Sequence, residues 1–251
     1  MIIITTQCFY PQIGGIEALM SGMAEGMAKT GKDILVLADG PINETDNLQN
    51  YKIKRFNAWK PIRRTSKARY IKKICKDGGI EAIYADSWKS IEYLKLVDVP
   101  IHVLAHGTEI QKDFSSWNFY KQNKQIRIHS SYMNSTTIAA NSNYTKELLI
   151  ESLSIDKNKI KIIHPGIDVY NEFIKKSTLS KVKNIIGNAH PVLITLARLE
   201  HRKGHKIVLD ALSTLIRKYP NLLYLIAGDG PNKESIKLHV KKLNLEKNIR
   251  F

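Results

Sequence analysis

Two cations directly after a predicted buried strand are the first candidates for chemistry in this sequence. Residues 192–197 form an apolar run of strand length, and Arg198 and Lys203 follow it. Gly204 then precedes a helical pattern, and the free backbone amides at a helix start favour an anion. Since ligands of open α/β sheets bind at the carboxyl ends of the strands, this arrangement predicts an anion site. Solvated surface charge is the alternative interpretation of the two cations.

Pairs of glycines mark two other predicted turns. Gly14 and Gly15 precede a helical stretch over 17–29, and a backbone without side chains can approach a phosphate or a sugar closely. A tight turn is the commoner use of such a pair. A second apolar run, 222–227, ends in the turn sequence Gly228-Asp229-Gly230-Pro231.

A histidine ends another predicted strand. His106 closes the run 101–106 and is followed by Gly107. A side chain at this position faces the same edge of the sheet as the Gly14-Gly15 loop, which favours a role in ligand binding. A purely structural histidine is the alternative.

The elements that position these residues alternate between strand and helix. Strands are predicted at 1–6, 33–38, 81–86, 101–106, 136–141 and 159–164, with helical patterns between them. This alternation is typical of a parallel sheet covered on both faces, and it predicts a first domain over 1–170. A polar, weakly periodic stretch over 171–190 predicts a linker, and a second α/β domain follows over 191–251.

Composition narrows the classes of partner. The chain has 251 residues, 43% of them hydrophobic, and a formal net charge of +16, which favours an anionic nucleotide, a nucleic acid or an acidic bilayer. The only cysteines are Cys8 and Cys75, so neither a disulfide framework nor a zinc site is supported. No segment reads as a signal peptide or a membrane span. We expect a cytoplasmic protein, with association to the inner membrane surface left open.

The segment 52–76 is rich in lysine and arginine and contains no acidic residue. Aromatic and apolar residues, among them Trp59 and Tyr70, are interleaved with the cations. A basic segment with an apolar face can lie on anionic lipid, so a peripheral membrane contact is one interpretation. An ordinary solvated helix face is the other.

Six motifs in order resemble those of glycosyltransferase family 4. They are FYPQIGGIE (9–17), HGTE (106–109), AANSNYTKELL (139–149), IIHPGID (162–168), ARLEHRKGH (197–205) and AGDGP (227–231). The resemblance implies a retaining, nucleotide-sugar-dependent enzyme of the GT-B fold, with two Rossmann-like domains. It also implies that the domain over 1–170 binds the acceptor and the domain over 191–251 binds the nucleotide sugar.

The resemblance also implies roles for single residues. Arg198 and Lys203 match the pair that holds the donor diphosphate and stabilises its charge as the glycosidic bond breaks. His106 matches the histidine beside the reacting sugar, and Glu109 is expected on the acceptor side of the same loop. Asp168 matches a hinge or capping position rather than a catalyst.

The same resemblance implies roles for four glycines and a reaction without a metal ion. Gly14 and Gly15 are expected to approach the donor or the acceptor through their backbone, and Gly228 and Gly230 to shape the nucleotide pocket. Two fixed cations favour departure of a diphosphate without a metal. In agreement, the sequence contains no Asp-x-Asp pair, so we expect no metal and no cofactor besides the donor substrate.

The sequence departs from the family at its end. It stops at Phe251, where relatives continue, and its second domain lacks their Glu-x7-Glu motif. The second domain is therefore expected to be incomplete, with two full strands and the start of a third. A fragment, a chain that pairs with a separate subunit and a decayed copy are all compatible with this ending.

Two functions are therefore expected. The first is transfer of a sugar from a UDP-, GDP- or ADP-sugar to a saccharide or lipid-linked acceptor, in synthesis of cell-envelope polysaccharide or lipopolysaccharide. The second is a non-catalytic GT-B-like binding protein or subunit that needs a missing partner segment. A nucleic-acid partner is not expected, because only the charge suggests it and no nucleic-acid motif is present.

Overall fold

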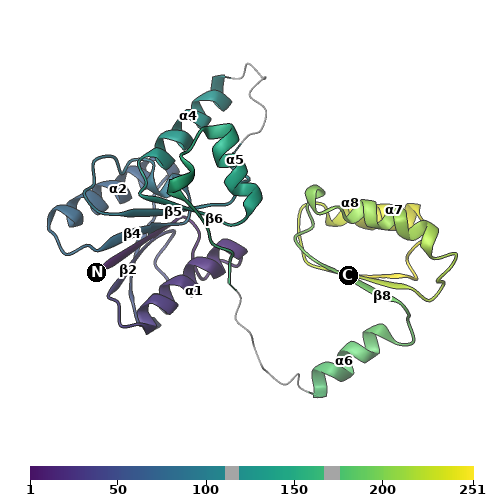
Figure 1. Ribbon diagram of the computed structural model, residues 1–251. Coiled ribbons are helices and arrows are strands. Elements are labelled where there is room, and N and C mark those ends of the chain that lie inside the picture. The colour runs from purple at the N-terminus through teal and green to yellow at the C-terminus, as the bar shows by residue number, and fades with distance from the viewer. Residues whose placement is uncertain (111–118, 167–175) are drawn as a thin grey trace. The chain divides into compact units, whose positions relative to one another are not determined.

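The chain folds into two compact units, Met1–Asp168 and Val169–Phe251 (Figure 1). The computed structural model describes residues 1–110, 119–166 and 176–251. Asp168 and the first five residues of the predicted linker lie outside these ranges. The described part of that linker contains a helix, α6 (Lys176–Ile186).

The first unit is built on one parallel sheet of seven strands. Their order is β3-β2-β1-β4-β5-β6-β7, so the chain adds strands first on one side of β1 and then on the other. The strands are β1 (Ile2–Thr6), β2 (Ile34–Asp39), β3 (Lys52–Phe56), β4 (Ala82–Ala85), β5 (Ile101–Ala105), β6 (Thr137–Ala140) and β7 (Ile160–Ile162). The predicted doubly wound sheet is confirmed, and β3 is a strand that the sequence did not indicate.

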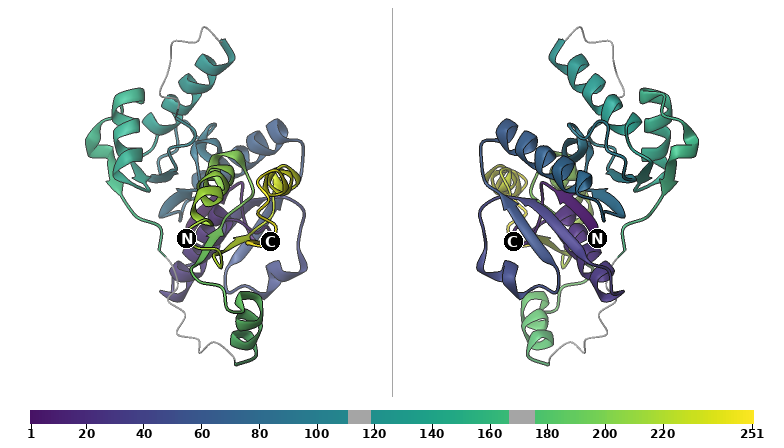
Figure 2. Two further views of the ribbon diagram at one scale, coloured as in Figure 1. Left: turned by 90° about the vertical axis from the view of Figure 1, so that its right-hand side faces the viewer. Right: turned by 90° about the vertical axis from the view of Figure 1, so that its left-hand side faces the viewer.

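Helices cover both faces of this sheet, as Figures 1 and 2 show. The α-helices are α1 (Gly15–Lys29), α2 (Lys60–Lys76), α3 (Trp88–Ile91), α4 (Phe119–Met133) and α5 (Asn143–Leu153). Two short 3-10 helices, η1 (Glu44–Leu48) and η2 (Lys157–Lys159), lie between strands. Because side chains alternate along a strand, Ile2 and Ile4 pack in one core with Met20 of α1, while Ile3 packs in another with Ile71 of α2.

The second unit has a smaller parallel sheet in the order β10-β9-β8. Its strands are β8 (Val192–Leu196), β9 (Leu223–Ala227) and β10 (Ile249–Arg250), so the third is short, as expected. The 3-10 helix η3 (His201–Lys203) leads into α7 (His205–Leu215), and α8 (Lys233–Lys242) follows β9. Helices α7 and α8 lie side by side over the sheet (Figures 1 and 2), where Leu209 and Ile236 join one core with Tyr224.

The basic segment 52–76 is not one amphipathic element. It forms the edge strand β3 and the helix α2, and several of its cations contact acidic groups elsewhere in the first unit. Arg55 pairs with Asp46, and Arg64 with Glu92. Trp59 stays exposed at the start of α2, so the structure leaves the membrane interpretation open while reducing the charge available for it.

A buried ion pair ties α2 to the carboxyl ends of β1 and β2. Lys67 Nζ lies 2.6 Å from Asp39 Oδ1 and donates a hydrogen bond of 2.7 Å to the carbonyl of Thr6. Both charged side chains are almost fully buried, at 2% and 4% exposure. Arg63 Nε approaches the other oxygen of Asp39 at 2.8 Å, as an ion pair without hydrogen-bond alignment. Burial lowers the pKa of Lys67, and the Asp39 carboxylate opposes that effect.

The two partners of this pair should differ in their contribution to stability. We expect Asp39→Asn to lower the free energy of unfolding by about 3–5 kcal/mol, because it leaves Lys67 charged and buried beside Arg63. Lys67→Met should cost clearly less, since Arg63 still compensates Asp39. Urea denaturation of the two variants measures the difference, and equal losses would contradict this assignment.

Candidate functional site

The pocket in the first unit lies where the strand order reverses. Strands β1 and β4 are neighbours, and the chain leaves their carboxyl ends toward opposite sides of the sheet, an arrangement that leaves a crevice. A pocket of about 290 Å³ lies at this edge. Its lining comes from the segments after β1, β4 and β5 and from the start of α1 and α4: Gln7, Cys8, Ile16, Asp86, Ser87, Trp88, Lys89, His106, Thr108, Glu109 and Lys124.

His106 is at this pocket, as its position after β5 predicts. Its Nε2 lies 2.8 Å from the backbone carbonyl of Asp86. A carbonyl oxygen can only accept, so Nε2 carries the proton. In the neutral ring Nδ1 is then an acceptor that a hydroxyl of a ligand can use.

Glu109 also lines the pocket, but its carboxylate already has partners inside the protein. Glu109 Oε1 accepts a hydrogen bond of 3.0 Å from the amide of His106 and one of 2.6 Å from the hydroxyl of Tyr132. Burial, with the Glu109 charge beside it, raises the pKa of Tyr132. Glu109 therefore holds the turn that carries His106, and its contact with an acceptor stays a prediction.

Asp86 is a pocket residue that sequence reasoning did not single out. Its buried carboxylate accepts four hydrogen bonds, from the side chains of Thr6, Ser87 and Ser90 and from the amide of Gln7. In the sequence, only the position of Asp86 at the end of the predicted strand 81–86 could have indicated a role at the pocket.

Cys8 is also at the pocket but is unsuited to nucleophilic chemistry. Burial, with Asp86 and Glu17 nearby, raises the pKa of its thiol to about 11. The thiolate, which is the reactive form, is therefore scarce at neutral pH.

The glycine pair before α1 leaves open space at the same edge. A side chain placed on Gly15 would meet nothing within 4 Å. One placed on Gly14 would overlap the end of the flexible Glu17 side chain. Packing inside the unit therefore does not require Gly15, and a role in ligand approach stays a prediction.

In the second unit, Arg198 and Lys203 lie on the connection between β8 and α7. Arg198 is 73% exposed and its Nη1 lies 3.2 Å from Glu200 Oε1. Lys203 is exposed at the end of η3, one residue before Gly204, which adopts a left-handed φ of 73° and caps α7. The strand, the two cations and the helix start thus follow the predicted order.

Gly228 and Gly230 pack against the backbone that carries Arg198. A Cβ on Gly228 would overlap the carbonyl oxygen of Ala197, and one on Gly230 would lie 2.7 Å from that of Leu199. The amide of Leu199 donates a hydrogen bond of 2.9 Å to the carbonyl of Asp229. The two glycines therefore fix the Arg198 connection by close approach, in addition to forming a turn.

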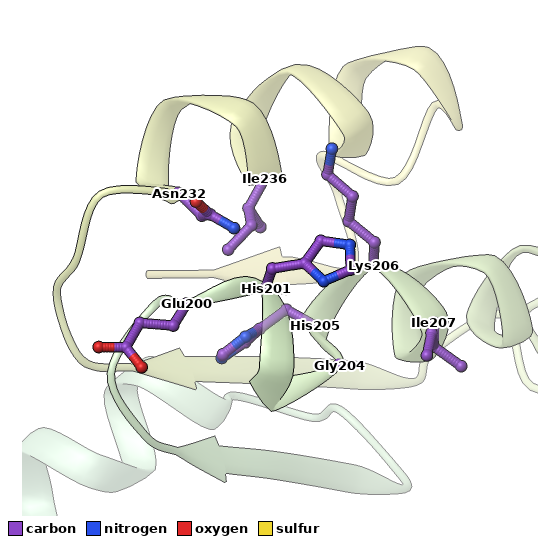
Figure 3. A pocket seen from close by; sticks show the side chains of 8 residues that line it. All are labelled: Glu200, His201, Gly204, His205, Lys206, Ile207, Asn232 and Ile236. Atoms are coloured by element: carbon purple, nitrogen blue, oxygen red, sulfur yellow. The ribbon is translucent and has the colours of Figure 1, made fainter. Parts of the chain in front are cut away.

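A small hollow of about 50 Å³ lies between this connection and α8 (Figure 3). Figure 3 shows His201, Gly204 and His205 on one side and Asn232 and Ile236 on the other. His205 is 2% exposed, and neither of its ring nitrogens has a hydrogen-bond partner within the described residues. The volume suits one or two water molecules and is far below that of a sugar nucleotide.

No metal site is apparent in the described ranges. They contain no group of three or more histidine, cysteine, aspartate or glutamate side chains that could hold a metal ion. None of the described helices combines the length and apolar character needed to cross a bilayer.

Each of the two units matches a known protein family. The family described as Glycosyltransferase Family 4 matches residues 13–170, and the family described as Glycosyl transferases group 1 matches residues 176–251.

Curated relatives are also glycosyltransferases or glycolipid synthases. An uncharacterized glycosyltransferase of Haemophilus influenzae is 26% identical over 95% of this chain and 65% of its own length. The alpha-monoglucosyldiacylglycerol synthase of Acholeplasma laidlawii is 22% identical over 92% of this chain and 63% of its own length. The chain spans between 23% and 65% of the length of the curated relatives that it matches.

Solved structures share the fold. HepE of Anabaena, solved in complex with UDP, superposes with a TM-score of 0.75 at 19% identity, over all of this chain and 68% of HepE. The expected GT-B class, with two Rossmann-like units, is confirmed by this likeness.

The glycines of the second unit permit a graded test. We expect Gly228→Ala to destabilise this unit by about 3 kcal/mol, because the new Cβ overlaps backbone that cannot move away. Gly204→Ala should cost about 1 kcal/mol, since its surroundings are open and only the left-handed φ is unfavourable. Amide-hydrogen exchange in β8 and β9 measures both losses, and the reverse ranking would contradict the close approach.

Proposed function

Because the chain belongs to Glycosyltransferase Family 4, we propose that it moves a sugar from a nucleotide-diphosphate donor to a hydroxyl of a saccharide or lipid-linked acceptor. The observation that carries this proposal is the pair Arg198 and Lys203 on the connection between β8 and α7. Glu200 is the only acidic side chain paired with Arg198 among the described residues, and both cations are largely exposed. They can therefore exchange solvent for a phosphate oxygen at small cost.

The chemistry requires stabilisation of the leaving diphosphate. As the bond between the anomeric carbon and the phosphate oxygen breaks, negative charge builds on that oxygen. Two fixed cations and the amides at the start of α7 stabilise that charge. We propose that no metal ion is needed.

We propose that the anomeric configuration is retained. In the reaction that we adopt, the acceptor hydroxyl attacks from the face that the diphosphate leaves, and its proton passes to the departing phosphate oxygen. Support comes from Asp86, the pocket carboxylate that follows β4. Its two oxygens together accept four hydrogen bonds, so it lacks the free, solvated oxygen that suits a nucleophile.

UDP is the nucleotide that we propose to test before GDP and ADP, because HepE was solved with UDP and with UDP-glucose. The glycolipid named in the Acholeplasma relative supports a lipid-linked acceptor in the cell envelope. An enzyme with such an acceptor would work at the cytoplasmic face of the membrane, with Trp59 and the exposed lysines of 52–76 as the contact.

The two cations should dominate donor binding. We expect Arg198→Ala and Lys203→Ala each to weaken UDP binding by about tenfold or more, because each removes a charge-assisted contact to the diphosphate. Arg202→Ala is the matched control, since Arg202 is also an exposed cation of this connection and pairs with Glu200 at 2.8 Å. Titration calorimetry with UDP, GDP and ADP measures the effect. Unchanged affinity in both variants, with intact folding, would refute the proposed donor site.

His106 should act mainly on the rate of transfer. We expect His106→Ala to lower kcat by about 100-fold with a smaller change in KM, because Nδ1 would bind a reacting hydroxyl most strongly in the transition state. His129→Ala, at a histidine of α4 that does not line the pocket, should leave both constants unchanged. A rise in KM alone would place His106 in ground-state binding. Turnover is followed by release of UDP from UDP-glucose in the presence of saccharide acceptors. No turnover despite UDP binding would favour a non-catalytic binding protein.

A further inference from the structure

Two lysines line the first-unit pocket, and neither is ion-paired with the two acids that also line it, Asp86 and Glu109. Lys89 comes from α3 and Lys124 from α4, and both line the cavity of about 290 Å³. No ion pair links either lysine to an acidic residue in the described ranges. Both side chains are partly buried, so water screens their charges less than those of surface lysines.

The acids that line the pocket are occupied. Both oxygens of the Asp86 carboxylate accept hydrogen bonds from Thr6, Gln7, Ser87 and Ser90. Oε1 of Glu109 accepts two hydrogen bonds that hold the turn after β5, while Oε2 has no hydrogen bond within the described residues. Neither is free to move toward the two lysines without breaking internal hydrogen bonds.

The surroundings of Lys89 contain more cations than acids. Burial lowers the pKa of its ammonium, and the positive charges of Arg64, Lys124 and Lys60 lower it further, with only Asp86 opposing them. Arg64 is paired with Glu92, which Arg127 also contacts. The nearby acid is therefore shared between two arginines, and an anion entering the pocket would relieve the repulsion among the lysines.

We propose that this pocket recognises an anionic group on the acceptor, namely a phosphate or carboxylate carried by the saccharide, through Lys89 and Lys124. The inference rests on the proposed function, because it names the acceptor class of that reaction. The donor diphosphate has its own cations in the second unit, so the anion here belongs to another molecule.

The other pocket residues fit a charged sugar. Trp88 and Ile16 supply apolar surface, and Nδ1 of His106 can accept a hydrogen bond from a hydroxyl. The volume is close to the lower end of about 300–1,000 Å³ for small-molecule sites, which suits one sugar ring with its charged substituent. Lys89 and Lys124 thereby select the acceptor, while His106 lies beside the hydroxyl groups of the ring.

Binding of three monosaccharides to the 251-residue chain tests this inference. The probes are glucose, glucose 6-phosphate and glucuronate, each titrated at low ionic strength with and without saturating UDP. We expect at least one of the two anions to bind about tenfold or more tightly than glucose, because each gains charge-assisted hydrogen bonds. The tighter of the two identifies the group as phosphate or carboxylate.

Variants that each remove one lysine charge test where the anion binds. Lys89→Met and Lys124→Met keep the apolar stem of the side chain and should reduce the preference for the anion to threefold or less. Lys161→Met, at an exposed lysine of β7, removes the same net charge and should retain the preference. Nuclear magnetic resonance of lysine side chains should show the Lys89 pKa rising when the anion binds. A pKa that does not rise would overturn the assignment.

Two outcomes separate this inference from the proposed function. If UDP binds but glucose and both anions bind equally, or if UDP displaces the anion, the anionic acceptor pocket is refuted and the transferase proposal stands. If an anion binds through Lys89 and no nucleotide binds, the pocket stands and the proposed donor chemistry fails.

Discussion

The common direction of all seven strands is the constraint on which the first unit depends. Parallel strands end at one edge of the sheet, so polar residues far apart in the chain meet there. Thr6 and Asp86 are 80 positions apart and are hydrogen-bonded, because β1 and β4 are neighbours. The reversal of strand order at this pair leaves a crevice, and His106 reaches it from β5.

Buried acids at the same edge of the sheet have partners inside the first unit. Asp39 and Lys67 compensate each other below the surface, and the charge of Asp86 is stabilised by hydrogen bonds rather than by a paired cation. The interior acids are thus occupied by structural tasks. Lys89, by contrast, lies at the pocket without an ion-paired acid among the described residues, and the cations near it outnumber the one nearby acid, Asp86.

The second unit positions its cations through backbone rather than through side chains. Arg198 is exposed and makes one ion pair, yet the connection that carries it is held by hydrogen bonds to the turn after β9. Gly228 and Gly230 permit that approach, because any side chain there would overlap carbonyl groups of the connection. The close backbone approach therefore fixes the position from which the exposed Arg198 side chain can reach a diphosphate.

The alternation of strands and helices, the parallel class of the sheets and the positions of Arg198 and His106 at strand ends could be predicted from the sequence, because they follow from local apolar periodicity. It did not reveal β3, an edge strand in which three of the five residues, Lys52, Lys54 and Arg55, are cations. Only the tertiary structure decided that Lys67 is buried, that Glu109 supports a turn and that Lys89 faces a pocket. The reason is that burial and pairing depend on which strands become neighbours, and no local pattern encodes the partners of a charge.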